Sequence, residues 1–410
     1  MQRMPKAGPP APTSKATAAP PGGRLRIGFF TDTYAPQVNG ISISLQLLVR
    51  GLRAAGHEVT IFAPRFPGYK DPEPGIYRVP SVRYMHKPPM YVAVPGTPRT
   101  TLSLRRCKFD VLHVHSPLTV GLLAYLTATT KNVPLIYTYH TSITDYTHYV
   151  RLVGRTRPFR WVARWFSTAT TNLGDQIVVP SIKFKKLLHD QKVRRPIHLI
   201  PNGIDLSRFK KPRSRGTFRR RLGMPARAPL LLYVGRIAPE KRLDFLMEAF
   251  SRIGAVHPNA HLVFAGDGSS RSKLEAQAAK SAFRERIHFL GMVSHAELPD
   301  LLHDATLFLS ASTSEVHPIS MIEAITAGLP IVAVKDDAFE GMLVDNFNGR
   351  ATTRSAGALA TAVSELLQDT KSMRQYRKNS LKLSRNYSIK AQVDSLVKLY
   401  RDAIHENRGQ

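Results

Sequence analysis

Short apolar runs and longer amphipathic segments alternate along the first half of the chain. Apolar runs bounded by turn residues predict buried strands, and a stretch with helical spacing between two of them predicts a crossover helix. This succession of strand, helix and strand is typical of a doubly wound parallel sheet. The predicted strands are 26–30, 59–63, 110–115, 135–139, 176–179 and 198–200, with helices at 42–55 and 119–130. Residues 64–100, rich in Pro, Tyr and Arg, show little periodicity and are expected to be irregular.

The second half repeats the same alternation, so both halves are predicted to be α/β. Its predicted strands are 230–234, 261–265, 287–290, 307–309 and 331–334. Its predicted helices are 243–253, 271–282, 295–304, 356–367, 371–384 and 389–405. We expect a disordered Pro/Ala-rich basic tail (1–24), a first domain (25–205), a polar linker (206–222), a second domain (223–385) and a C-terminal helix (386–410) that can return to the first domain.

Composition indicates a folded, strongly basic protein. With 410 residues and 43% hydrophobic content, the chain is large enough for two or three cores. The single cysteine, Cys107, excludes an intrachain disulfide and is compatible with a reducing compartment. No run of apolar residues is long enough to span a membrane, and the first 24 residues lack the apolar core of a signal peptide.

The net charge of +30 is concentrated in the first half. Residues 1–210 hold 30 Lys and Arg against 9 Asp and Glu, whereas residues 211–410 hold 29 against 20. Such a surface attracts polyanions, and charge alone leaves nucleic acid and an anionic lipid surface as alternatives.

Residues 307–334 combine two predicted strands with a helix suited to anion binding. Pro318 is expected to be the first residue of this helix, which should end near Gly328. The amides of Ile319, Ser320 and Met321 would then lack intrahelical partners and form an anion site.

Two glutamates flank the start of this helix. Glu315 precedes it and Glu323 lies about a turn and a half inside it, so a bound phosphate would have a carboxylate on either side. This arrangement suits a sugar–diphosphate–nucleoside, with Glu315 on the sugar and Glu323 on a ribose. The alternative is a capped surface helix whose glutamates only complement its dipole.

A second predicted loop supplies cations. Arg236 and Lys241 follow the strand 230–234, with Pro239 between them. If this loop lies beside Glu315, the two cations form a clamp that stabilises a diphosphate leaving group without a metal ion. No cluster of carboxylate, His or Cys residues has the spacing of a metal site. Residues 291–293, ending at Val293, can offer backbone groups to a nucleotide base.

The first half offers Gly40 for the donor and further residues for an acceptor. Its first loop has no dinucleotide fingerprint, but Gly40 would let backbone approach a ligand or simply start a helix. His140 follows a predicted strand, where α/β sites are built, although a structural role remains an alternative. Polar and aromatic neighbours suited to an acceptor are Asp145, Tyr146, His148 and Tyr149.

A predicted helix starting at Pro158 carries both tryptophans of the protein. Trp161, Val162, Trp165 and Phe166 occupy one arc, and Arg157, Arg160 and Arg164 occupy another. Tryptophan beside arginine fits a membrane interface, with a core-facing amphipathic helix as the alternative. Six further basic residues, between Lys183 and Arg195, extend the basic surface.

Together these motifs resemble those of the retaining GT-B glycosyltransferases. The likeness covers about residues 24–405 and rests on Gly235-Arg236 with Glu240-Lys241, on Glu315 followed by Glu323-Ala324, on Ala327–Pro330 and on the turn 201–205. It implies two Rossmann-like domains with a cleft between them, the donor bound mainly by the second and the acceptor by the first.

The resemblance also implies roles for single residues. Arg236 and Lys241 would bind the diphosphate, Glu323 the ribose, Glu315 the transferred sugar, and His140 would lie near the sugar and acceptor. The sequence departs from the family pattern at His317-Pro318, where the proline removes one amide and leaves Ile319 and Ser320 for the phosphate. The family is argued to react on one face of the sugar, without Glu315 as a covalent nucleophile.

Within the family, residues 31–40 and 139–149 look most like the bacterial diacylglycerol glycosyltransferases. This likeness implies transfer of glucose or galactose from a UDP-sugar to a lipid, with retained α configuration, by a peripheral protein on the cytoplasmic side of the cell membrane. No other cofactor and no nucleic acid are expected. Alternatives are a phosphoinositide, polysaccharide or soluble acceptor, or a nucleic-acid-binding protein built on a nucleotide-binding fold.

Overall fold

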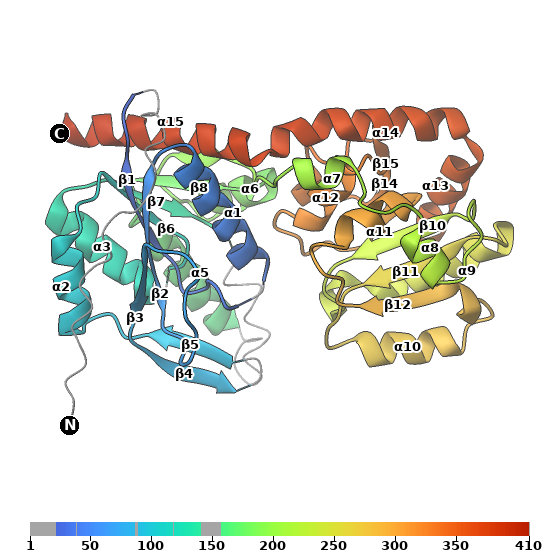
Figure 1. Ribbon diagram of the computed structural model, residues 1–410, viewed down its shortest axis with the longest axis horizontal. Helices are drawn as coiled ribbons and strands as arrows, with labels where there is room; N and C mark the ends of the chain where they lie inside the picture. The colour runs from blue at the N-terminus through green and yellow to red at the C-terminus, as the bar shows by residue number, and fades with distance from the viewer. Residues whose placement is uncertain (1–21, 38, 87–88, 118, 141–156, 410) are drawn as a thin grey trace. The chain divides into compact units, whose positions relative to one another are not determined.

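The computed structural model describes residues 22–37, 39–86, 89–117, 119–140 and 157–409. The chain divides into two compact units, and Figure 1 shows the elements of each. Unit 1 comprises Met1–Gly203 and Ile389–Gln410, and unit 2 comprises Ile204–Ser388. Unit 1 is therefore built from two separate stretches of sequence. The predicted disordered tail lies almost wholly outside the described residues.

Unit 1 contains a seven-stranded parallel sheet in the order β3-β2-β1-β6-β7-β8-β9. The strands are β1 (Arg26–Phe30), β2 (Glu58–Pro64), β3 (Ile76–Val79), β6 (Val111–Val114), β7 (Leu135–Thr138), β8 (Gln176–Val179) and β9 (Ile197–Leu199). A separate antiparallel pair is formed by β4 (Ser81–His86) and β5 (Pro89–Ala93). The helices are α1 (Gly40–Ala54), α2 (Pro98–Arg106), α3 (Thr119–Lys131), α5 (Arg157–Thr171), α6 (Ile182–Asp190) and α15 (Ile389–Arg408).

Helices α1 and α15 pack together on one face of this sheet. Leu48 and Leu52 of α1 share a buried cluster with Leu396 and Tyr400 of α15 and with strand residues such as Phe29. The C-terminal helix is thus an integral part of the core of unit 1.

Unit 2 contains a six-stranded parallel sheet in the order β12-β11-β10-β13-β14-β15. Its strands are β10 (Leu230–Val234), β11 (His261–Ala265), β12 (Ile287–Gly291), β13 (Leu307–Ser310), β14 (Ile331–Val334) and β15 (Gly349–Thr352). Its α-helices are α7 (Ser207–Lys210), α8 (Thr217–Arg221), α9 (Leu243–Val256), α10 (Arg271–Ala279), α11 (Leu298–Asp304), α12 (Ile319–Thr326), α13 (Ala356–Gln368) and α14 (Thr370–Ser384).

Both faces of this second sheet are buried, which explains why its strands read as continuous apolar runs. Leu230 and Leu232 of β10 point into a cluster that includes α11 and α12, whereas Leu231 and Tyr233 point into a cluster with α9 and α13. The alternation follows from the two-residue repeat of a strand.

The structure corrects two expectations about local organisation. Residues 206–222 are not a linker, because they form α7 and α8, whose Phe209 and Phe218 are buried in the core of unit 2. Residues 64–100 are not irregular, since they contain three strands and α2. Both segments therefore belong to the folded units.

Candidate functional site

The order of strands reverses in unit 2 between β10 and β13. Strands β11 and β12 lie on one side of this pair, and β14 and β15 lie on the other. In open α/β sheets, the loops that leave the carboxyl ends of strands at such a reversal build the ligand site. The two loops in question carry the predicted cations and glutamates.

The loop after β10 is held in a defined shape. The Tyr233 hydroxyl donates to the carbonyl oxygen of Arg236 at 3.0 Å, and a 3-10 turn follows over Pro239–Lys241. Gly266, which follows β11, lies against the same loop, where a Cβ atom would meet the Gly235 carbonyl oxygen at 1.9 Å. Only glycine permits this close approach of two backbones.

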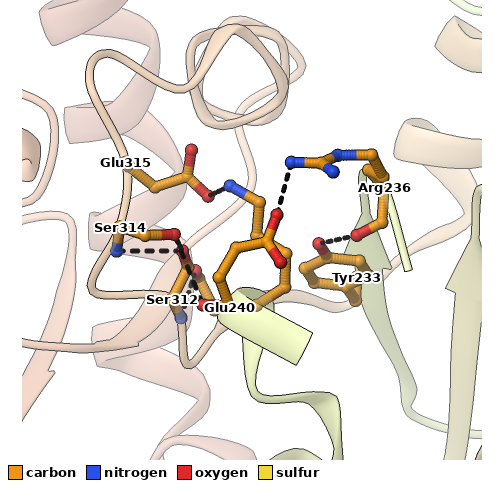
Figure 2. A network of polar contacts seen from close by, with 8 residues as sticks. Tyr233, Arg236, Glu240, Ser312, Ser314 and Glu315 are labelled. Atoms are coloured by element: carbon orange, nitrogen blue, oxygen red, sulfur yellow. Dashed lines mark hydrogen bonds and ion pairs between the residues drawn. The ribbon is translucent and has the colours of Figure 1, made fainter. Parts of the chain in front are cut away.

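Lys241 and Glu315 join the two loops. The Lys241 Nζ lies 2.6 Å from the Glu315 Oε1, and their side chains are only 13% and 18% exposed. The Ser314 hydroxyl also donates to the Glu240 carbonyl oxygen at 3.3 Å (Figure 2). Removing one partner of such a poorly hydrated pair leaves an uncompensated charge, at a cost of ~2 kcal/mol or more.

Arg236 completes the cationic group of this loop. Its guanidinium pairs with Glu240 one turn away and is about half exposed (Figure 2). The structure therefore brings together Arg236, Lys241 and Glu315, the three residues expected at one diphosphate and sugar. Each cation is paired with a carboxylate from the same network.

Helix α12 begins one residue later than predicted. Pro318 has extended backbone angles and is the N-cap, so the helix starts at Ile319. The Met321 amide donates to the Pro318 carbonyl oxygen at 3.1 Å, and it is therefore not free as expected. Within the described chain, the amides of Ile319 and Ser320 have no acceptor, and these two N–H groups can bind an anion.

Glu323 is buried within α12. Loss of hydration raises the pKa of its carboxyl to about 8, an effect that Arg208 partly opposes. The folded protein therefore keeps Glu323 largely protonated at neutral pH, so it can donate a hydrogen bond as well as accept one. Nearby His317 is also buried, and the same cause lowers its pKa to about 3.

Val293 lies two residues beyond β12, which is an edge strand of this sheet. Its side chain is partly buried against the apolar cluster of unit 2. The Gly291 carbonyl oxygen accepts from the Gly266 amide at 2.8 Å, which ties this segment to the loop after β11. The expected contact of residues 291–293 with a base stays a prediction.

The strand order of unit 1 reverses between β1 and β6, and Asp32 lies at that point. Its amide donates to the Ser116 hydroxyl oxygen at 3.0 Å, and its Oδ1 accepts from the Thr119 hydroxyl at 3.0 Å. The other carboxylate oxygen, Oδ2, is buried and has no partner in the described part of the chain. Loss of hydration raises the pKa of Asp32 to about 6. Asp32 is not among the site residues predicted from the sequence, although its place after an apolar strand was a usable signal.

His140 follows β7 and belongs to a group of buried rings. Its Nε2 lies 3.0 Å from the Nδ1 of His115, so one of the two nitrogens donates and the other accepts. Loss of hydration lowers the pKa of His140 to about 4, which keeps the ring neutral. His113, beside them, bonds to Thr138 and to Tyr400 of α15, each at 2.6 Å.

The remaining residues predicted for sites in unit 1 are placed in part. Gly40 is the first residue of α1, after the N-cap Asn39, and a Cβ at Gly40 would meet nothing within 4 Å. This agrees with either of its two interpretations. Asp145, Tyr146, His148 and Tyr149 lie outside the described residues.

Helix α5 turns its large apolar residues outward. Trp161 is 68% exposed and Trp165 is 61% exposed, and Val162 and Phe166 are exposed as well. The buried face consists of Ala163, Ser167 and Thr171. The core-facing alternative is therefore wrong for the described part of this helix. Arg164 is exposed on it, while Arg157 and Arg160 lie in its first turn.

A basic groove adjoins the tryptophans. It is lined in part by Trp165, Asn172, Lys192, Arg194 and Arg195. The Arg195 guanidinium donates to the Asn172 carbonyl oxygen at 3.1 Å, which holds it beside α5. Exposed aromatic rings and cations thus share one surface of unit 1, the combination that binds lipid headgroups.

Two features, a membrane-spanning helix and a cluster of metal ligands, are absent from the described residues. None of the helices within them is both long and apolar enough to cross a membrane. The same residues contain no group of three or more His, Cys, Asp or Glu side chains able to hold a metal ion.

The chain thus has two doubly wound units, one of them with a cation–glutamate network where its strand order reverses, and comparison with known proteins identifies the family that has this architecture. Residues 38–208 match the family model described as Glycosyltransferase Family 4, and residues 214–383 match Glycosyl transferases group 1. The chain belongs to the GT-B glycosyltransferases.

Among its relatives are two lipid glycosyltransferases. An alpha-monoglucosyldiacylglycerol synthase of Streptococcus pneumoniae is 30% identical over 397 residues, covering 94% of this chain and 88% of the relative. A protein of the same description from Acholeplasma laidlawii is 29% identical over 406 residues, covering 93% and 98%. Among solved structures, Anabaena Alr3699/HepE in complex with UDP has a TM-score of 0.76 at 15% identity, covering 92% of this chain and all of that one. The structural likeness supports the fold.

Proposed function

We propose that the protein is a retaining glycosyltransferase that moves glucose or galactose from a UDP-sugar to diacylglycerol and forms an α-glycosyl lipid. The observation that carries this proposal is the similarity, at 30% identity over 94% of the chain, to an alpha-monoglucosyldiacylglycerol synthase. This similarity spans both units, so it includes the half proposed to bind the donor and the half proposed to bind the acceptor.

The donor is assigned to the network in unit 2. Lys241 and Arg236, with the amides of Ile319 and Ser320, would neutralise the diphosphate as it leaves, in the role that a metal ion has elsewhere. This assignment is supported by the 2.6 Å contact between Lys241 and Glu315, which shows that the two loops meet. Glu315 would then contact the transferred sugar.

Glu323 and His140 complete the proposed donor and acceptor contacts. A protonated Glu323 can donate to one ribose hydroxyl oxygen while its carbonyl oxygen accepts from the other. His140 is neutral because its pKa is about 4, so its ring can form a hydrogen bond with a hydroxyl group without carrying a positive charge.

The acceptor is assigned to a membrane. Helix α5 exposes Trp161 and Trp165 while it buries only small residues, which supports insertion of the rings at headgroup depth. The adjoining Lys192, Arg194 and Arg195 supply attraction to anionic lipid. In this proposal the protein is peripheral and acts on the cytoplasmic side of the cell membrane.

A product assay tests the proposal. The protein is incubated with radiolabelled UDP-glucose, UDP-galactose or GDP-mannose and with vesicles of phosphatidylglycerol, with or without diacylglycerol; vesicles with phosphatidylinositol and a soluble polysaccharide serve as other acceptors. We expect a diacylglycerol-dependent lipid product from a UDP-hexose, with an α linkage by proton NMR. Label found only in phosphatidylinositol or in the polysaccharide, or a β linkage, contradicts the proposal.

The donor site is tested with Lys241→Ala. We expect turnover to fall about 100-fold or more, because a preorganised charge on the leaving group is lost. Lys273→Ala is the matched control, since Lys273 is an exposed lysine on α10 of the same unit. Near-normal turnover in the Lys241 variant overturns the assignment.

A further inference from the structure

A second cationic cavity, of about 520 Å³, lies at the amino-terminal edge of the unit 2 sheet. It is lined by Ala305 and Thr306, which directly precede β13, whereas Glu315 follows the other end of that strand. The cavity and the proposed donor site therefore lie at opposite edges of the sheet.

Residues 213–221 form one wall of the cavity, and two carboxylates of α11 hold this segment in place. Asp304 accepts from the amides of Gly216 at 2.6 Å and Phe218 at 2.9 Å, and Asp300 accepts from the amide of Arg213 at 2.6 Å. Both aspartates are buried, and these hydrogen bonds occupy them. They hold Arg215, Arg219 and Arg220 around the cavity without forming a side-chain ion pair with any of the three.

Arg219 is fixed at the base of this wall. Its guanidinium donates to the carbonyl oxygens of Asp304 at 2.9 Å and Ala228 at 2.6 Å. The carbonyl oxygens orient the guanidinium without neutralising it, and the nearby Asp304 carboxylate offsets part of its positive charge.

Arg377 reaches the cavity from α14. It is partly buried, and among the described residues it has neither a carboxylate nor a hydrogen-bond acceptor as a partner. Loss of hydration lowers the pKa of Arg377, as expected for a guanidinium that lacks a counter-charge. The side chain of Arg215, which is more exposed, also lacks a hydrogen-bond or ion-pair partner within the described chain.

His303 lines the cavity and lies within the positive electrostatic field of its arginines. Its Nε2 donates to the Phe209 carbonyl oxygen at 2.8 Å, so the Nδ1 of the neutral ring is an acceptor. Loss of hydration lowers the pKa of His303; the hydrogen bond to Phe209 and the charge of Asp300 oppose this shift, whereas the positive charges of Arg377 and Arg215 add to it. The two arginines from different elements thus act on one ring.

We propose that this cavity binds a small molecule that carries a phosphate or diphosphate group. Four arginines line it against a single aspartate, which the amides already engage. Planar guanidinium groups match phosphate oxygens, and the volume is that of a small-ligand site. The His303 Nδ1 would accept from a hydroxyl of the ligand. Because the cations converge on one concavity from α8, the turn before it and α14, a compact anion fits them better than an extended polymer.

The test uses a variant in which the proposed donor clamp is removed, Arg236→Ala with Lys241→Ala, so that this clamp does not contribute to the measured binding. Inorganic pyrophosphate is titrated into this protein by calorimetry, and glucose 1-phosphate is titrated in parallel to distinguish a sugar phosphate from a free diphosphate. We expect one binding site. Adding Arg377→Gln or Arg215→Gln should weaken it about tenfold each, the loss typical of one charge-assisted hydrogen bond.

Arg374→Gln is the matched control, because Arg374 is exposed on the same helix but does not line the cavity. It should leave both affinities unchanged. Absence of binding in the clamp variant, or equal weakening by Arg374→Gln, overturns the proposal. Arg215 is exposed, so Arg215→Gln keeps the test valid even if Arg377→Gln impairs folding. The result does not depend on the proposed donor, since the clamp is absent throughout.

Discussion

Replacing Trp161 and Trp165 with Ala should weaken binding to vesicles while leaving the fold intact. The rings are 68% and 61% exposed, so their removal opens no cavity. A free Trp side chain presents up to ~250 Å². The two exposed fractions therefore offer about 300 Å² of largely apolar surface, worth ~8 kcal/mol if wholly removed from water at ~25 cal/mol per Å².

At headgroup depth, only part of this ring surface is removed from water. If about a third to a half of the surface is buried, the loss on substitution is ~3 kcal/mol, which corresponds to roughly a hundredfold weaker partitioning. Co-sedimentation with vesicles of phosphatidylglycerol and diacylglycerol measures this directly, and circular dichroism melting checks the fold.

The chain offers a matched control for this experiment. Leu122 and Leu126 are one turn apart on α3 of the same unit and are 50% and 53% exposed, so replacing both with Ala removes apolar surface of the same spacing elsewhere. We expect that variant to bind vesicles normally. Equal binding by the Trp variant and the wild type, or an equal loss in the Leu variant, refutes a specific role for α5.

Three further predictions concern residues within each unit. Glu323→Gln should flatten the pH dependence of stability: between about pH 4.5 and 8 the unfolded chain ionises this carboxyl while the folded protein keeps it protonated, so wild-type stability falls with rising pH relative to the variant in urea titrations. A steeper slope in the variant would contradict the burial argument. Because burial lowers the pKa of His140 to about 4, His140 should cause no inflection near pH 6.5 in the pH profile of kcat. An inflection near 6.5 in the wild type that is absent from His140→Gln would contradict this. Phe218→Ala should cost unit 2 about 3–5 kcal/mol in urea unfolding, since Phe218 is buried, whereas Arg221→Ala on the same helix should cost less than ~0.5; a small loss for Phe218 would restore the linker interpretation.

The buried strands were the predictable part of the fold. Runs such as Leu230–Val234 and Ile331–Val334 are apolar throughout because both faces of the sheet are covered, and this signal is local. The edge strands β3 and β15 lack it, since Ile76–Val79 and Gly349–Thr352 are only partly buried. Helix α8 depends on Asp304, which lies 86 residues from Phe218 in the sequence and leaves no mark near it.

In the candidate site, too, local features were predictable from the sequence, whereas contacts between distant segments were not. Spacing put Arg236, Lys241 and Glu315 at strand ends, but only the pairing of β10 with β13 makes those ends neighbours. Asp32 follows an apolar strand, which is a local signal, but its hydrogen-bond partners Ser116 and Thr119 lie 84 and 87 residues away in the sequence. For α5, periodicity defined two arcs, and only the packed structure shows which arc faces outward.

The last helix of the chain bears on how the protein is made. Leu396 and Tyr400 fill the core built on β1 and α1, so the first unit lacks part of its interior until the ribosome has added residues 389–408. Unit 2, whose residues 204–388 are contiguous, has its whole sequence available earlier. During synthesis, the half that begins first is therefore the half that is completed last, and a nascent chain stalled before Ile389 would expose the apolar surface of α1.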